Sequence, residues 1–178
     1  MTKSNNILLA HDRVADHDIF ARYGYIICEH PQKTLYTSLK DEFTDFMSCS
    51  IANFSSTKER LKCLEDYHCF VSHHSIDHHQ FIQQIGRKID HHLLYSDYMK
   101  VLIEQCQDYF NSKMGVYQNI GEFRVSRPNQ NDFSPFHRDH WFEYFTPLLN
   151  LYIPLSGSWF DSAMQIVPKS HLWTEEQV

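Results

Sequence analysis

The apolar residues of this chain change their spacing near residue 115, and this change restricts the fold more than any other feature. Before it they recur at helical intervals, as at Leu39 and Phe43, which is typical of amphipathic helices. After it, Phe123 and Val125 alternate with polar residues, as they do in a strand with one buried face. We therefore expect an α+β chain whose helices precede its strands.

Length and composition favour one compact unit. The chain has 178 residues, of which 42% are hydrophobic, so it can bury one substantial core. We expect a single domain, 1–178, with a mainly helical part at 1–114 and strands at 115–178. A formal net charge of -6 argues against nucleic acid and anionic membrane surfaces as partners.

Capping residues and apolar spacing predict where the elements lie. The expected helices are residues 16–23, Pro31 to Ser48, 82–94 and the stretch from Ser96 onward. Gly24 is expected to end the first helix in a left-handed conformation. A buried strand should follow at 25–28, and residues 51–75, whose periodicity is poor, should form an irregular connection.

The cysteines and the N-terminus indicate a compartment. The five cysteines contain no Cys-x-x-Cys pair and are odd in number, as expected of reduced thiols. The apolar run near the N-terminus is too short for a signal peptide, and no stretch is long enough to span a bilayer. We expect a cytoplasmic protein with no membrane partner.

His137 and Asp139 are the clearest candidates for a functional site. Side chains two apart on a strand point to the same side, so an imidazole and a carboxylate could converge on one cation. Together they supply two of the three ligands of a His/His/carboxylate iron site, which leaves positions open for a cosubstrate and dioxygen. The pair therefore suits non-haem Fe(II), and a polar turn between strands is the alternative interpretation.

A second group of histidines offers a different metal hypothesis. Six of them gather in one region: His73, His74, His78, His79, His91 and His92. If the region is one helix, His74 and His78 share a face and could chelate a transition ion. A solvated helix surface is the simpler interpretation.

Several stretches together resemble a known family. They are Phe20 to Ile27, Phe123 to Asp139, Leu148 to Leu155, and Ala163-Met-Gln-Ile-Val-Pro-Lys-Ser-His171. In order and spacing they resemble the phytanoyl-CoA dioxygenase family of Fe(II)- and 2-oxoglutarate-dependent oxygenases, although Lys169 stands where that family has glycine. The resemblance implies N-terminal helices packed on a partial double-stranded β-helix, or jelly-roll, core.

The resemblance also implies a reaction and a set of site residues. Fe(II) would be held by His137 and Asp139, and 2-oxoglutarate would be consumed while a C–H bond of a small organic substrate is hydroxylated. The side chains expected near 2-oxoglutarate are Ser126, Arg124 and Tyr152, and those expected to line a substrate pocket are Trp141 and Phe142. A solvated sheet face and aromatic core packing are the alternative interpretations of these two sets.

One iron ligand remains unassigned. In this family the second iron-binding histidine and the arginine for the far carboxylate of 2-oxoglutarate come after the Pro-Gly-Ser-His stretch, to which His171 belongs as a structural residue. The sequence ends at Val178, so we expect a longer reading frame or a second copy in a homo-oligomer to complete the β-core. The alternative function is a non-catalytic scaffold that binds a metal or a partner.

Overall fold

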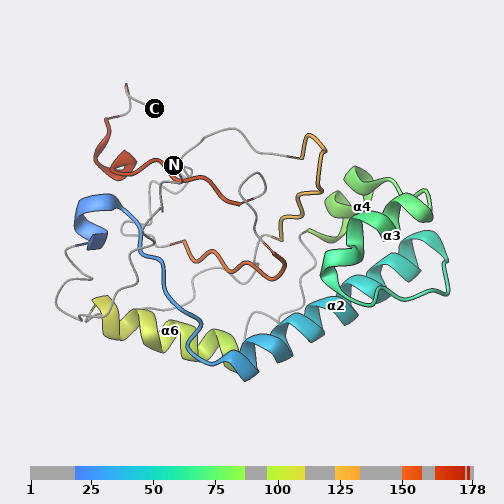
Figure 1. The fold of residues 1–178 in the computed structure, drawn as a ribbon, viewed down its shortest axis with the longest axis horizontal. Helices are drawn as coiled ribbons and strands as arrows, with labels where there is room; N and C mark the ends of the chain where they lie inside the picture. The colour runs from blue at the N-terminus through green and yellow to red at the C-terminus, as the bar shows by residue number, and fades with distance from the viewer. Residues whose placement is uncertain are drawn as a thin grey trace, which may run out of the picture.

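A computed structural model describes residues 19–86, 96–110, 123–132, 150–157, 163–174 and 176 of the chain. More than half of these residues are helical (Figure 1). A helical turn at 19–23 is followed by α2 (Lys33–Ser55), η1 (Leu64–Asp66), α3 (Tyr67–His73), α4 (His78–Ile85), α6 (Asp97–Phe110) and η2 (Ser170–Leu172).

Helix α2 is the element against which the other helices pack. Its buried face repeats every four residues, at Leu39, Phe43, Met47 and Ile51. The sequence interpretation ended this helix at Ser48, which is wrong, because Ile51 continues the same apolar stripe for another turn and is fully buried. The helix ends where Ser56 adopts the left-handed conformation, with φ of 57°.

The core lies where α3 and α4 meet the C-terminal half of α2, while α6 contacts α2 nearer its beginning (Figure 1). Phe81 on α4 is fully buried, and its ring contacts those of Phe54 and Tyr67 at centroid distances of 5.5 and 6.2 Å. The prediction of an irregular connection over 51–75 is therefore wrong in large part. The segment contains the end of α2, η1 and α3, whose buried residues Leu64, Tyr67 and Val71 join this core.

The end of the first helical turn, at Gly24, and the start of α6 follow the sequence prediction. Gly24 has φ of +83°, and its N–H donates to the carbonyl of Phe20 at 2.7 Å, as expected of a left-handed cap. Ser96 precedes α6, and its hydroxyl accepts from the N–H of Met99 at 3.4 Å. The buried strand expected at 25–28 is wrong, because these residues form no strand with the rest of the described chain and Ile27 is 61% exposed.

The predicted jelly-roll core is wrong for the part of the chain that the structure describes. Three non-helical segments follow the helices, 123–127, 151–155 and 164–167, and the first two pack on the helical core, but no strand pairing occurs among the described residues. The alternation of apolar and polar residues predicted correctly which side of the segment 123–127 faces inward. Phe123 stacks on Phe43 at a centroid distance of 5.3 Å, and Val125 packs on the helical core. A β-core needs ladder hydrogen bonds in addition, and these are absent from the described segments.

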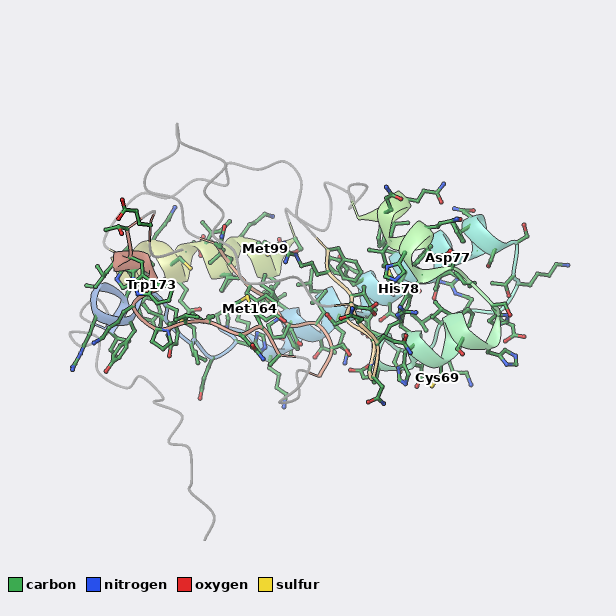
Figure 2. All side chains as sticks on the ribbon, turned by 90° about the horizontal axis from the view of Figure 1, so that it is seen from above. Cys69, Asp77, His78, Met99, Met164 and Trp173 are labelled. Atoms are coloured by element: carbon green, nitrogen blue, oxygen red, sulfur yellow. The ribbon has the colours of Figure 1, made fainter. Side chains whose placement is uncertain are left out.

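The segment 163–172 returns to the beginning of the described chain. The N–H of Lys169 donates to the carbonyl of Tyr23 at 2.9 Å, and His171 Nε2 lies 3.0 Å from the carbonyl oxygen of Ala21. The turn at 19–23, in blue, and η2, in red, accordingly lie together in Figures 1 and 2. Among the described helices, none has the length and apolar character needed to cross a membrane.

Candidate functional site

A buried network of polar side chains lies where the segment 123–132 meets α3 and α4. The chain turns at Pro128 and Asn129, as its residue types predict, and this turn brings Arg127 and Asp132 together. Arg127 donates three hydrogen bonds to one carboxylate. Its backbone N–H and Nε reach Asp132 Oδ2 at 3.0 and 2.7 Å, and its Nη2 reaches Oδ1 at 2.8 Å. The geometry is bidentate, which gives both direction and strength to the pair.

His78 brings α4 into this network. It is the first residue of α4, preceded by Asp77, whose carboxylate accepts from the N–H of Gln80 at 3.0 Å and caps the helix. Figure 2 shows His78 on the side of α4 that faces the extended segment, and its side chain is 4% exposed. Its Nδ1 shares a hydrogen bond of 3.0 Å with the hydroxyl of Tyr67, and its Nε2 faces Asp132 Oδ2 at 3.6 Å.

The charges of this network follow from burial and from the Arg127 guanidinium. Hydrogen bonds from Arg127 lower the pKa of Asp132 to about 2, so the carboxylate is ionised at neutral pH. Burial lowers the pKa of His78, and the Arg127 charge lowers it further, so the imidazole is neutral. Burial also raises the pKa of Tyr67, which keeps its hydroxyl protonated.

His79 adds a further nitrogen at the edge of the network. Its side chain is 75% exposed, and its Nε2 lies 4.0 Å from Asp132 Oδ1. One donor atom from each of His78, His79 and Asp132 falls within 4.8 Å of the others. Two imidazoles and a carboxylate are the donor types that zinc and other first-row transition ions accept. Sequence reasoning found the two histidines but missed Asp132 as their neighbour.

The structure changes the interpretation of the histidine-rich region. Helix α3 ends at His73 and α4 begins at His78, with a turn at 74–75 between them. His74 and His78 are therefore not neighbours on one helical face, and a solvated surface is wrong for His78. His91 and His92 lie outside the described residues.

The structure describes the residues predicted to lie near 2-oxoglutarate but not the predicted iron ligands. Arg124 and Ser126 are exposed on the extended segment 123–127, and Tyr152 is 50% exposed on the segment 151–155. No hydrogen bond joins Tyr152 to Ser126 in the described part of the chain. The iron ligands His137 and Asp139, and the predicted pocket residues Trp141 and Phe142, lie outside the described residues.

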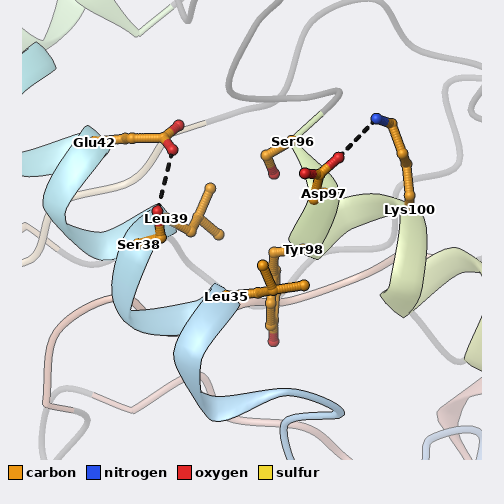
Figure 3. A pocket seen from close by; sticks show the side chains of 8 residues that line it. All are labelled: Leu35, Ser38, Leu39, Glu42, Ser96, Asp97, Tyr98 and Lys100. Carbon is orange, nitrogen blue, oxygen red and sulfur yellow. Dashed lines mark hydrogen bonds and ion pairs between the residues drawn. The ribbon is translucent and has the colours of Figure 1, made fainter.

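A cleft of about 350 Å³ lies between α2 and α6 (Figure 3). Leu35, Leu39 and Tyr98 form its apolar part, and an ion pair of 2.8 Å between Lys100 and Asp97 stands at its edge. Among the predicted site residues that the structure describes, Arg124, Ser126 and Tyr152, none lines this cleft.

No protein-family model matches the chain, no curated protein matches it, and no solved structure matches its fold.

Proposed function

We propose that this chain is an Fe(II)- and 2-oxoglutarate-dependent dioxygenase, whole or in part, which hydroxylates a C–H bond of a small organic substrate. The observation that supports it best is a contact between two stretches that carry the family resemblance. The turn ending at Gly24 and the Pro-Lys-Ser-His stretch are joined by the Lys169 and His171 hydrogen bonds. Random similarity in two stretches about 150 residues apart gives no reason for them to meet.

The packing at that contact fits a structural role for His171. A Cβ placed on Gly24 would lie 2.3 Å from His171 Nδ1, so the imidazole occupies the space that a side chain would need. With Nε2 engaged at the Ala21 carbonyl, this histidine locks the return of the chain rather than binding iron. The proposal therefore keeps His137 and Asp139 as the metal ligands and leaves His171 out.

The side chains of His137 and Asp139 are suitable ligands for the proposed iron. One imidazole and one carboxylate suit Fe(II), which takes nitrogen and oxygen ligands and retains open positions. The iron, with 2-oxoglutarate, would supply the oxidising power for the hydroxylation. The chain's own contribution would be to hold the ion at His137 and Asp139, to offer the Arg124 charge and the Ser126 and Tyr152 hydroxyls to carboxylate oxygens, and to surround the substrate with Trp141 and Phe142.

The setting of the proposed enzyme follows from its charge and its thiols. None of the five cysteines, all of which the structure describes, forms a disulfide, which supports a reducing compartment such as the cytoplasm. The net charge of -6 supports a small molecule rather than nucleic acid as the partner.

The proposal is tested by following 2-oxoglutarate turnover. The purified chain is incubated with Fe(II), ascorbate and 2-oxoglutarate in air, and succinate is quantified, because these enzymes consume 2-oxoglutarate slowly even without their substrate. We expect succinate from the wild type and none above background from His137→Ala or Asp139→Ala. Succinate formation that survives both substitutions would contradict the assignment. A folded wild type that forms none would favour the non-catalytic, metal- or partner-binding module.

A further inference from the structure

His78 is a buried imidazole that faces the carboxylate of Asp132. Its side chain is 4% exposed, and its Nε2 lies 3.6 Å from Asp132 Oδ2, which is longer than a hydrogen bond. The other ring nitrogen is fixed by the hydroxyl of Tyr67 at 3.0 Å. A metal-binding histidine is typically held in this way, with one nitrogen hydrogen-bonded and the other presented to the ion.

The neighbouring donors complete a set of three. His79 Nε2 lies 4.0 Å from Asp132 Oδ1, and the three donor atoms lie within 4.8 Å of one another. Donor atoms around one ion at metal–ligand distances near 2.1 Å stand about 3.0–3.5 Å apart. Closing the set requires a movement of about 1 Å, which His79 can make because its side chain is 75% exposed.

Arg127 leaves room for a metal on the same carboxylate. An ionised carboxylate has about two acceptor positions on each oxygen. Asp132 Oδ2 already accepts from the backbone N–H and Nε of Arg127, whereas from the described residues Oδ1 accepts a single bond, from Nη2. Oδ1, which has this second acceptor position, is also the oxygen that His79 approaches. Arg127 would then stay as the partner that orients the liganding carboxylate.

We propose that His78, His79 and Asp132 bind a divalent first-row transition ion, with Zn²⁺ as the representative, at the junction of α4 and the segment 123–132. Water would complete the coordination. The site uses neither His137 nor Asp139 as a ligand and does not depend on the proposed oxygenase function. The ion would join the helical core to the extended segment beside Arg127, and the positive charge of that side chain would keep the affinity moderate.

The test is a calorimetric titration with Zn²⁺ alone. The background is the double variant His137→Ala/Asp139→Ala, which removes the proposed iron ligands so that the two sites are not confused. We expect one Zn²⁺ per chain, and we expect His79→Asn to weaken binding about tenfold or more. His79 is exposed, so this substitution leaves the fold intact. His73→Asn, an exposed histidine at the end of α3, is the matched control and should change the affinity by less than about threefold.

Three results would overturn the proposal. They are a background protein that is folded by circular dichroism but takes up no Zn²⁺, unchanged binding in His79→Asn, and an equal loss in His73→Asn. If the double variant does not fold, the same comparison is made in the wild type. There His79→Asn must remove one binding event that His137→Ala leaves in place, and failure to do so overturns the proposal equally.

Discussion

Asp132 accepts three hydrogen bonds from one arginine and sits almost wholly out of solvent, with 4% of its side chain exposed. At the scale of single residues these bonds close the turn within the segment 123–132, and the same carboxylate faces His78 of α4 at 3.6 Å. Removing one partner of such a pair leaves the other charge poorly solvated, which costs more than the pair itself contributes.

We therefore predict that Asp132→Asn lowers the free energy of unfolding by about 2–4 kcal/mol. The measurement is urea denaturation followed by circular dichroism. Asp45→Asn is the matched control, because Asp45 also pairs with an arginine, Arg60, at 2.7 Å, but with side chains 75% and 65% exposed. That variant should unfold close to the wild type, since exposed pairs contribute little. Equal losses in the two variants would contradict the role given to Asp132.

The same carboxylate predicts a pH dependence with a definite sign. Arg127 lowers the pKa of Asp132 from an ordinary value of 3.8 to about 2 in the folded state, so the unfolded chain binds the proton first. The contribution of Asp132 is complete above about pH 5 and is lost as the pH falls through about 4 to 2. The stability difference between wild type and Asp132→Asn should shrink over this range. A constant difference down to about pH 2.5 would contradict the shifted pKa.

The Arg127–Asp132 pair shows what residue-level reasoning could have found. Opposite charges stand on either side of residues 128–131, whose proline and asparagines favour a turn, and a turn brings its flanks together. The neighbours of Asp132 on α3 and α4 had no such signal. Tyr67 and His78 are far away in the sequence, so only the tertiary packing of the helices decides that they meet it.

At the scale of elements, helices were predictable where one face carries a regular apolar stripe. Leu39, Phe43 and Met47 mark the buried face of α2 because side chains four apart lie above one another on a helix. Helix α3 was missed because its seven residues make fewer than two full repeats of the pattern and include polar residues on the outer side. Short helices of this kind are stabilised by packing rather than by their own sequence.

The contact between the turn at 19–24 and η2 gives the prediction at this scale. Gly24→Ala should destabilise the chain by about 2 kcal/mol or more, because alanine at a φ of +83° is strained and its Cβ would meet His171. His171→Ala should cost about 1 kcal/mol for the lost hydrogen bond. In the His171→Ala background, Gly24→Ala should then cost only the backbone strain, about 1 kcal/mol.

A double-mutant cycle by thermal or urea unfolding measures this coupling. The two substitutions are expected to be less harmful together than the sum of their separate effects, since the clash disappears with the imidazole. Strict additivity would mean that Gly24 and His171 do not touch, and it would remove the main structural support for the proposed function.

At the scale of the whole molecule, the order of helices and extended segments was readable, but their assembly was not. Alternation along a segment reports one buried and one exposed face, and Phe123 and Val125 do pack inward. It contains no information on which segment supplies the ladder partner, because that choice is non-local. The described segments 123–127 and 151–155 rest on helices, as where the Tyr36 hydroxyl donates to the Pro154 carbonyl at 2.6 Å.

The central claim, that His137 and Asp139 hold Fe(II) together with 2-oxoglutarate, is tested most directly by an anaerobic absorption titration. Fe(II) and then 2-oxoglutarate are added to the purified chain, and the weak visible charge-transfer band of the iron chelate is followed, with His137→Ala as one control and His79→Asn as the other. We predict a saturable band that is lost in His137→Ala and kept in His79→Asn. A folded wild type without a band, or a band that survives His137→Ala, would contradict the account.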